Sequence, residues 1–165
     1  MKKLITLLLI LVSISCSSQT NLDKLVFEKI NDYRESKGLS SLIWDNKTFN
    51  ASKHHTKYLV VNKVVGHNEK NNTPTPKSRL DYYGVKYDYS GENCAKVIIG
   101  IIEKYSNDEY LSSEIVDGWK NSPYHNKIML GENYKFGGVS CIKDGNLLYS
   151  TLNVYGYANL QGLKL

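Results

Sequence analysis

Motifs that mark the common cofactor sites are absent from this sequence. It contains no CxxC pair, no HExxH segment and no Walker-type glycine loop, so structural zinc, zincin and nucleotide-binding functions have no support. Lysine and arginine exceed aspartate and glutamate by 21 to 16, but no dense basic run occurs. We therefore predict that nucleic acid is not a partner.

Proline, phenylalanine and cysteine are also scarce, with three of each, whereas tyrosine occurs 13 times. The chain of 165 residues is 41% hydrophobic and 22% charged, which is typical of a folded globular domain. No internal repeat and no second domain boundary is found. The sequence predicts one domain with a proper core.

The first 15 residues have the features of a secretory signal peptide. Two lysines precede an apolar run at 4–12, and small residues lead directly to Cys16. The run is too short to span a bilayer, which takes about 20 residues. Cys16 resembles the lipidated cysteine of bacterial lipoproteins, with 16–21 as a tether, and we predict export to the bacterial cell envelope. Ordinary secretion, with Cys16 in a loose tail, is the alternative.

The two remaining cysteines are Cys94 and Cys141. Outside the cytoplasm such a pair forms a disulfide readily, so we predict a bond between them. It would close a loop of about 46 residues and contribute on the order of 4 kcal/mol. Two buried free thiols are the alternative.

Hydrophobic spacing predicts helices first and a hairpin last. Three helices are expected at about 22–36, 46–63 and 76–83. A fourth is expected to begin at a capping box formed by Ser106 and Glu109, and a fifth, short helix is expected to begin after Ser122 as its cap. A chain break is expected at 88–91, and Asp144-Gly145 is expected as the turn of a terminal hairpin. The pattern is typical of an α+β fold with helices packed on an antiparallel sheet.

Several segments, taken in order, resemble one family. They are Asn31–Arg34, Gly38-Leu39, Leu42–Asp45, Gly66-His67, Gly91–Asn93, Gly118-Trp119, Ser122–His125 and Gly137–Val139. Together they resemble the CAP superfamily, whose SCP-like domain would occupy residues 22–160. The resemblance implies a three-layer α-β-α sandwich, with helices on both sides of a small antiparallel sheet.

The resemblance also implies a site. Two histidines and two acidic residues line a cavity in this family, and some members bind a divalent cation such as zinc there. The matching positions are His67, Glu92 and His125, whereas Ser122 stands where many members carry the second glutamate. Glu114 lies nearby without a motif match. A connected polar network without any ligand is the alternative for the three matching residues.

Other candidate residues have less support. His54 and His55 lie in a polar stretch and are predicted to be solvated, and Ser122 is predicted to be a helix cap rather than a nucleophile. A tyrosine cluster at 82–89 is expected either to wall a groove or to pack as half-buried side chains.

The function implied by the resemblance is that of a binding or envelope-associated module. Its partners would be the membrane, through the N-terminal lipid, and an unidentified small molecule, lipid, glycan or peptide in the cavity. The alternative is a metal-assisted hydrolase of peptide or cell-wall substrates, with Glu92 as general base. A purely structural surface protein is a third hypothesis.

Overall fold

Nine regular elements follow one another along residues 19–99 and 107–158, the parts of the chain that the computed structural model describes. Their bounds, in chain order, are α1 (Asn21–Ser36), β1 (Ile43–Trp44), α2 (Asn46–Asn62), α3 (Pro76–Tyr82), β2 (Tyr89–Ile98), α4 (Asp108–Lys120), α5 (Pro123–Met129), β3 (Phe136–Asp144) and β4 (Leu147–Gly156).

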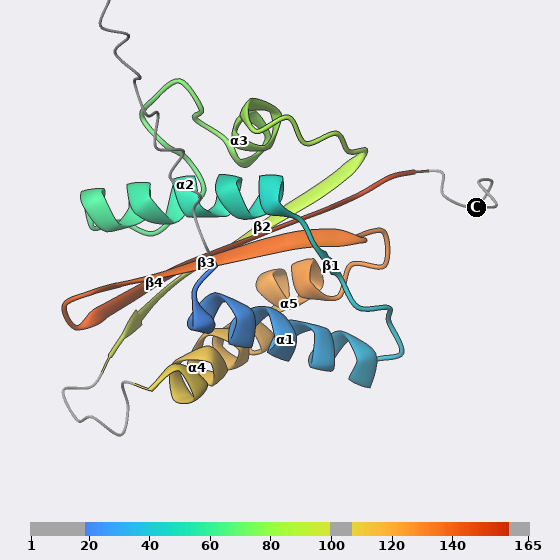
Figure 1. The fold of residues 1–165 in the computed structure, drawn as a ribbon, viewed down its shortest axis with the longest axis horizontal. Coiled ribbons are helices and arrows are strands. Elements are labelled where there is room, and N and C mark those ends of the chain that lie inside the picture. The colour runs from blue at the N-terminus through green and yellow to red at the C-terminus, as the bar shows by residue number, and fades with distance from the viewer. Residues whose placement is uncertain (1–18, 100–106, 159–165) are drawn as a thin grey trace, which may run out of the picture.

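The elements form three layers. Helices α2 and α3 cover one face of the sheet, and α1, α4 and α5 cover the other (Figure 1). The predicted α-β-α sandwich of the α+β class is therefore confirmed. Within the first layer α2 crosses β3 and β4 and α3 contacts β2, and within the second layer α1 packs on β3 whereas α4 and α5 pack against β2.

The sheet is mixed rather than wholly antiparallel. Its strand order is β1-β3-β4-β2, and β4 pairs antiparallel with both of its neighbours. The two-residue strand β1 adds to β3 in parallel, with Ile43 opposite Phe136. This parallel pair escapes sequence reasoning because β1 is too short to show alternation. The order leaves β2 at one edge of the sheet.

Four local predictions were wrong in detail. Gly91 lies inside β2, where it pairs with Val154, rather than in a break. Glycine stands at this strand position because a Cβ would lie 2.8 Å from Oη of Tyr134 and 2.9 Å from Cδ1 of Ile128. Asp144 pairs with Leu147, so the hairpin turn is one residue later than predicted. Ser122 precedes α5 without a side-chain capping bond. The cap of α4 is Asn107, and Ser106 lies outside the described residues.

The predicted disulfide is wrong. Cys94 and Cys141 are both buried free thiols. Cys94 pairs with Thr151 and Cys141 pairs with Ser150, on opposite sides of β4. Adjacent residues of a strand point to opposite faces, so the thiols lie two strands apart on different sides of the sheet. That separation is incompatible with disulfide geometry, in which Cβ atoms are about 4 Å apart.

The layer on the side of α1 and α4 is mostly apolar, although Asp23 and Arg34 of α1 are also buried there. Val26 and Ile30 of α1 face Leu111, Ile115 and Trp119 of α4, and all five side chains are buried. The predicted helical stripes account for this contact, since the residues recur at steps of three and four. A cluster of this size supplies most of the hydrophobic stabilisation of the fold.

Residues 1–18 lie outside the described parts of the chain, so the signal peptide and the lipidation of Cys16 stay predictions, as does the domain division at 22–160. Within residues 19–99 and 107–158, no helix combines the length and the hydrophobicity needed to cross a membrane.

Candidate functional site

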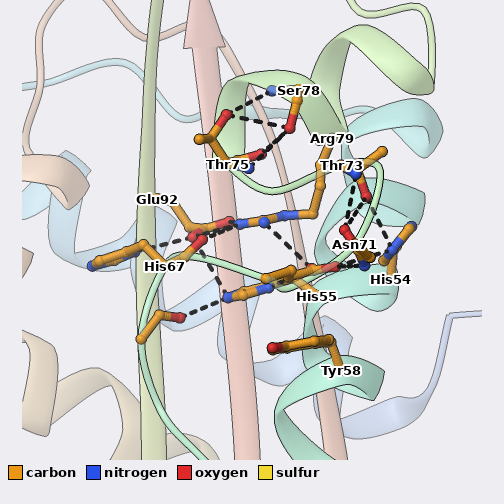
Figure 2. A network of polar contacts seen from close by, with 12 residues as sticks. His54, His55, Tyr58, His67, Asn71, Thr73, Thr75, Ser78, Arg79 and Glu92 are labelled. Carbon is orange, nitrogen blue, oxygen red and sulfur yellow. Dashed lines mark hydrogen bonds and ion pairs between the residues drawn. The ribbon is translucent and has the colours of Figure 1, made fainter.

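A buried ion pair occupies the layer between α2, α3 and the sheet. Glu92 projects from β2, and its side chain is 2% exposed. Arg79 of α3 is fully buried, and its Nη2 donates to both carboxylate oxygens of Glu92, at 2.8 and 3.0 Å (Figure 2). The start of α3, which carries this guanidinium, is fixed by a capping box between Thr75 and Ser78, with Pro76 as the first helical residue.

A second buried carboxylate shares the same guanidinium. Glu69 lies in the loop between α2 and α3, and its Oε1 is 3.3 Å from Nη1 of Arg79. Asn71 also donates to Glu69. Two carboxylates therefore face one guanidinium, and the cluster carries one more negative than positive charge unless a further cation is present.

His55 supplies a candidate for that cation. Its Nδ1 lies 2.7 Å from Glu69, and its Nε2 lies 2.7 Å from the carbonyl oxygen of Gly66. Both partners only accept hydrogen bonds, so both ring nitrogens donate when the imidazole carries its second proton. The prediction that His55 is solvated was wrong, since its side chain is fully buried. The signal was its four-residue spacing from buried Ala51 and Leu59.

His67 joins this buried cluster to the solvent. Its Nδ1 lies 3.0 Å from Oε1 of Glu92, and half of its side chain is exposed. The hydrogen bond to Glu92 raises the pKa of His67 above its usual value, although burial opposes the rise. Burial alone would raise the pKa of Glu92, but the hydrogen bond from His67 and the charge of Arg79 outweigh it and lower that pKa.

A cavity of about 500 Å³ opens in front of His67, along the outer edge of β2. His125 of α5 lies in its wall, where burial and then the charge of His67 lower the pKa of His125. Three tyrosines contribute to the remaining wall, and the other lining residues are polar or small except for Ile128. The lining is His67, Tyr89, Glu92, Asn93, Tyr124, His125, Lys127, Ile128, Gly131, Glu132, Asn133 and Tyr134.

Asn93 connects the cavity to α5. Its side-chain amide donates to the carbonyl oxygen of His125 at 2.9 Å. Its Oδ1 is buried and has no hydrogen-bond partner among the described residues. An acceptor left in this state favours a ligand with a hydroxyl or amide donor.

The structure thus places all three residues of the expected site around one cavity, but they point in different directions. In Figure 2 the second ring nitrogen of His67 points away from the buried cluster, whereas the carboxylate of Glu92 is turned inward to Arg79. In the cavity itself, His67 and His125 offer two imidazoles. Catalytic zinc usually takes three protein ligands, so the two imidazoles of the cavity do not fit a stable metal site.

The tyrosine cluster divides between its two expected roles. Tyr89 lines the cavity. Tyr83 and Tyr87 pack against a small core that contains Leu80 and Val85, and Tyr82 is 70% exposed away from the cavity. Glu114 lies in a shallower hollow beside β2 rather than among the cavity residues.

Two of the buried charges, Arg79 and Glu69, were missed by sequence reasoning. Neither belongs to a motif with a metal-ligand spacing, and a charged residue in a polar segment is most often solvated. The capping residues Thr75 and Ser78 could have indicated that a helix begins at Pro76. They could not have indicated which side chain of that helix turns toward the sheet.

Comparison with known proteins agrees with this geometry. The family model for the cysteine-rich secretory protein family, CAP, matches residues 27–158. The chain belongs to the CAP family. An uncharacterized membrane protein of Bacillus subtilis, YlbC, is 28% identical over 121 residues, which make up 73% of this chain and 32% of YlbC. The chain thus spans about a third of the length of this curated relative.

Two solved structures show the same fold. An extracellular SCP-domain protein of Bacillus anthracis matches with a TM-score of 0.67 and 24% identity, over 82% of this CAP chain and 40% of that chain. An outer surface protein of Borrelia burgdorferi matches with a TM-score of 0.68 and 20% identity, over 84% of this chain and 96% of that one.

Proposed function

We propose that this CAP protein is an exported, lipid-anchored module of the bacterial cell envelope that binds a sugar chain in the cavity beside β2. The observation that carries the proposal is the composition of the cavity wall. Tyr89, Tyr124 and Tyr134 surround a space of about 500 Å³ together with two imidazoles. Tyrosine has a flat apolar face and a polar tip, which suits a sugar ring with its hydroxyl groups.

Hydrogen-bonding groups in the wall fit the same ligand class. The outward ring nitrogen of His67 has room for a polar contact, and the side chain of Asn93, whose Oδ1 has no hydrogen-bond partner among the described residues, lies buried in the same wall. The wall contains one lysine and two glutamates, of which Glu92 is engaged by Arg79. A weakly charged aromatic wall of this kind favours a neutral glycan over a strongly anionic one.

Export and anchoring rest on the N-terminal sequence and on the relatives. The related structures come from an extracellular protein and an outer surface protein of bacteria. Cys16 follows a signal-like segment. We expect the wild-type protein to partition into detergent after membrane extraction and Cys16→Ala to be released into the soluble fraction. A soluble wild-type protein would overturn the anchor but leave the binding proposal standing.

Binding is tested by titrating the protein with glycan fragments of peptidoglycan and measuring the heat of binding. Tyr124 is 86% exposed and lies in the cavity wall, so Tyr124→Ala should weaken binding at least about tenfold without unfolding the protein. Tyr82→Ala is the matched control, because Tyr82 is 70% exposed outside the cavity. Equal losses in both variants, or no binding by the wild type, would contradict the proposal.

Hydrolysis is a second candidate function because of one contact. A carboxylate on Nδ1 of His67 orients the ring and leaves its Nε2 free to take a proton from water. A hydrolase requires that His67→Gln abolish turnover of the same glycan fragments while the melting transition stays nearly unchanged. Binding without turnover by the wild type selects the binding module.

A further inference from the structure

A thiol lies behind His67, on the buried side of the cluster. Cys94 follows Glu92 by two residues on β2, so the two side chains project from the same face. The Sγ of Cys94 is 3.6 Å from Oε1 of Glu92 and 3.8 Å from Nδ1 of His67. Neither the ion pairs of the cluster nor the cavity uses this thiol.

The donor atoms around Cys94 have the separations of a metal site. Nε2 of His55 lies 3.8 Å from Oε1 of Glu92, and one ligand atom each from His55, Glu92 and Cys94 lies within 4.8 Å of the others. Ligands about 2.0 to 2.3 Å from a tetrahedral zinc ion are about 3.3 to 3.8 Å apart. The distances among His55, Glu92 and Cys94 reach that range with side-chain movements of about 1 Å. His67 lies outside this group of three, although its Nδ1 is near Glu92 and Cys94, and it has the freedom to turn toward the ion because half of its side chain is exposed.

The charge of the cluster also leaves a place for a cation. Glu69 and Glu92 outnumber Arg79 by one negative charge, and the imidazoles of His54, His55 and His67 lie against these two carboxylates. A divalent ion that binds as Cys94 loses its proton adds one net positive charge to the cluster. The ion therefore offsets the excess negative charge of the two carboxylates.

We propose that His55, His67, Glu92 and Cys94 form a thiolate-containing site for a divalent cation of the zinc class, inside the α2 and α3 layer rather than in the cavity. On binding, the thiol proton of Cys94 passes to solvent, and the coordinating nitrogens, Nε2 of His55 and Nδ1 of His67, give up any proton that they carry, so that the neutral ring of His67 holds its proton on Nε2 instead of on Nδ1. Glu92 binds through Oε1 and keeps Arg79 on Oε2. His55 releases the carbonyl oxygen of Gly66 to turn its Nε2 to the ion.

The site is distinct from the one suggested by the family resemblance. It includes Cys94 and His55 and excludes His125. Burial raises the pKa of the Cys94 thiol well above its usual value, and the charge of Glu92 raises it further, so without a metal the thiol stays protonated. A bound cation reverses this preference because metals bind the deprotonated form.

The test uses cobalt(II) as the probe, added to the full chain carrying Cys16→Ser so that two thiols remain. We expect one equivalent of Co²⁺ to give a thiolate charge-transfer band in the near ultraviolet, and Zn²⁺ to abolish the band by competition. Cys94→Ser should remove the band, whereas Cys141→Ser, the matched buried thiol on the other face, should keep it. His55→Ala should weaken Co²⁺ binding at least about tenfold, and His125→Ala less than about twofold.

A second measurement needs no variant of the ligands. X-ray absorption of the zinc complex should show one sulfur at about 2.3 Å. No sulfur contact in a folded zinc-loaded protein would overturn the site, as would a cobalt band that survives Cys94→Ser. Loss of the band in His125→Ala but not in His55→Ala would move the metal to the cavity and also overturn it.

Discussion

The two faces of the sheet are stabilised in different ways. Under α1 and α4 the contact is mostly apolar, with Trp119 as the largest fully buried side chain, and the two buried charges there, Asp23 and Arg34, are held by backbone groups. Under α2 and α3 four ionisable side chains are buried against one another, namely His55, Glu69, Arg79 and Glu92. One face therefore gains most of its stability from apolar burial, whereas the other depends on charged side chains keeping one another as partners. The exposed edge between them is where the cavity lies.

The strongest way to break the charged face is to remove its only guanidinium. Arg79→Met leaves Glu69 and Glu92 buried without their guanidinium, with only imidazole and amide partners, and we expect a loss of about 3 to 5 kcal/mol in the free energy of unfolding at pH 7. Urea denaturation monitored by circular dichroism measures this. Acidification to about pH 4 should reduce the loss, because the stranded carboxylates can then be protonated.

A triple variant sharpens the same point. Arg79→Met combined with Glu69→Gln and Glu92→Gln removes all three charges and should recover most of the lost stability. Nε of Arg79 is buried without a hydrogen-bond partner among the described residues, so the native network is not fully satisfied either. If Arg79→Met alone costs less than about 1 kcal/mol, the charged face does not depend on its ion pairs.

The apolar face should respond differently. Leu111 is fully buried in α4, and Leu111→Ala is expected to lose about 2 to 4 kcal/mol through lost burial and the cavity left behind. No titratable group is removed, so the loss should be the same at pH 5 and pH 8 when measured by urea denaturation. A loss that varied strongly with pH would mean that the two faces are coupled.

Helix caps provide a smaller test of the α2 side. The side chain of Asp45 accepts from the backbone nitrogen of Thr48 at 2.8 Å, and Asp45→Ala should cost about 1 kcal/mol. Ser122 makes no capping bond, so Ser122→Ala should change the stability by less than about 0.5 kcal/mol. Thermal unfolding of both variants checks the pair. Equal losses would show that Ser122 does cap α5.

The face under α1 and α4 was easier to predict from the sequence than the face under α2 and α3. Helix α1 and the stripe of α4 were predicted because apolar residues recur at steps of three and four, and this periodicity is local. The burial of His55 was missed, because its polar neighbours obscured the four-residue spacing from Ala51 and Leu59. The register that separates Cys94 from Cys141 depends on β4, which lies between their strands, and no local pattern reveals it.

The candidate site shows the same limit. His67, Glu92 and His125 were found through short motifs, and the structure brings them to one cavity. The direction of the Glu92 carboxylate was not predictable, because it depends on Arg79, which reaches it from another element. Tertiary packing decides which charged side chains that are distant in sequence become partners. A motif shows only which residues are present, and not the direction in which their side chains turn.

The smallest expected effect lies at the rim of the apolar face. The carboxylate of Asp108 accepts hydrogen bonds from Lys143 at 2.9 Å and from Asn21 at 3.1 Å. These two bonds connect α4 to β3 and to α1. The hydrogen bond from Lys143 lowers the pKa of Asp108 below 3.8. Because the folded pKa is the lower one, the stabilisation is present above pH 3.8 and is lost as the pH falls through the folded value.

Asp108→Asn should therefore cost about 0.5 kcal/mol at pH 7 and nothing at about pH 2, measured by urea denaturation at low salt. Asp117→Asn is the control, since Asp117 pairs with Lys120 in the same helix and is 61% exposed, and its loss should be smaller at both pH values. A deficit of Asp108→Asn that persists at about pH 2 would mean that the carboxyl acts through neutral hydrogen bonds rather than through its charge.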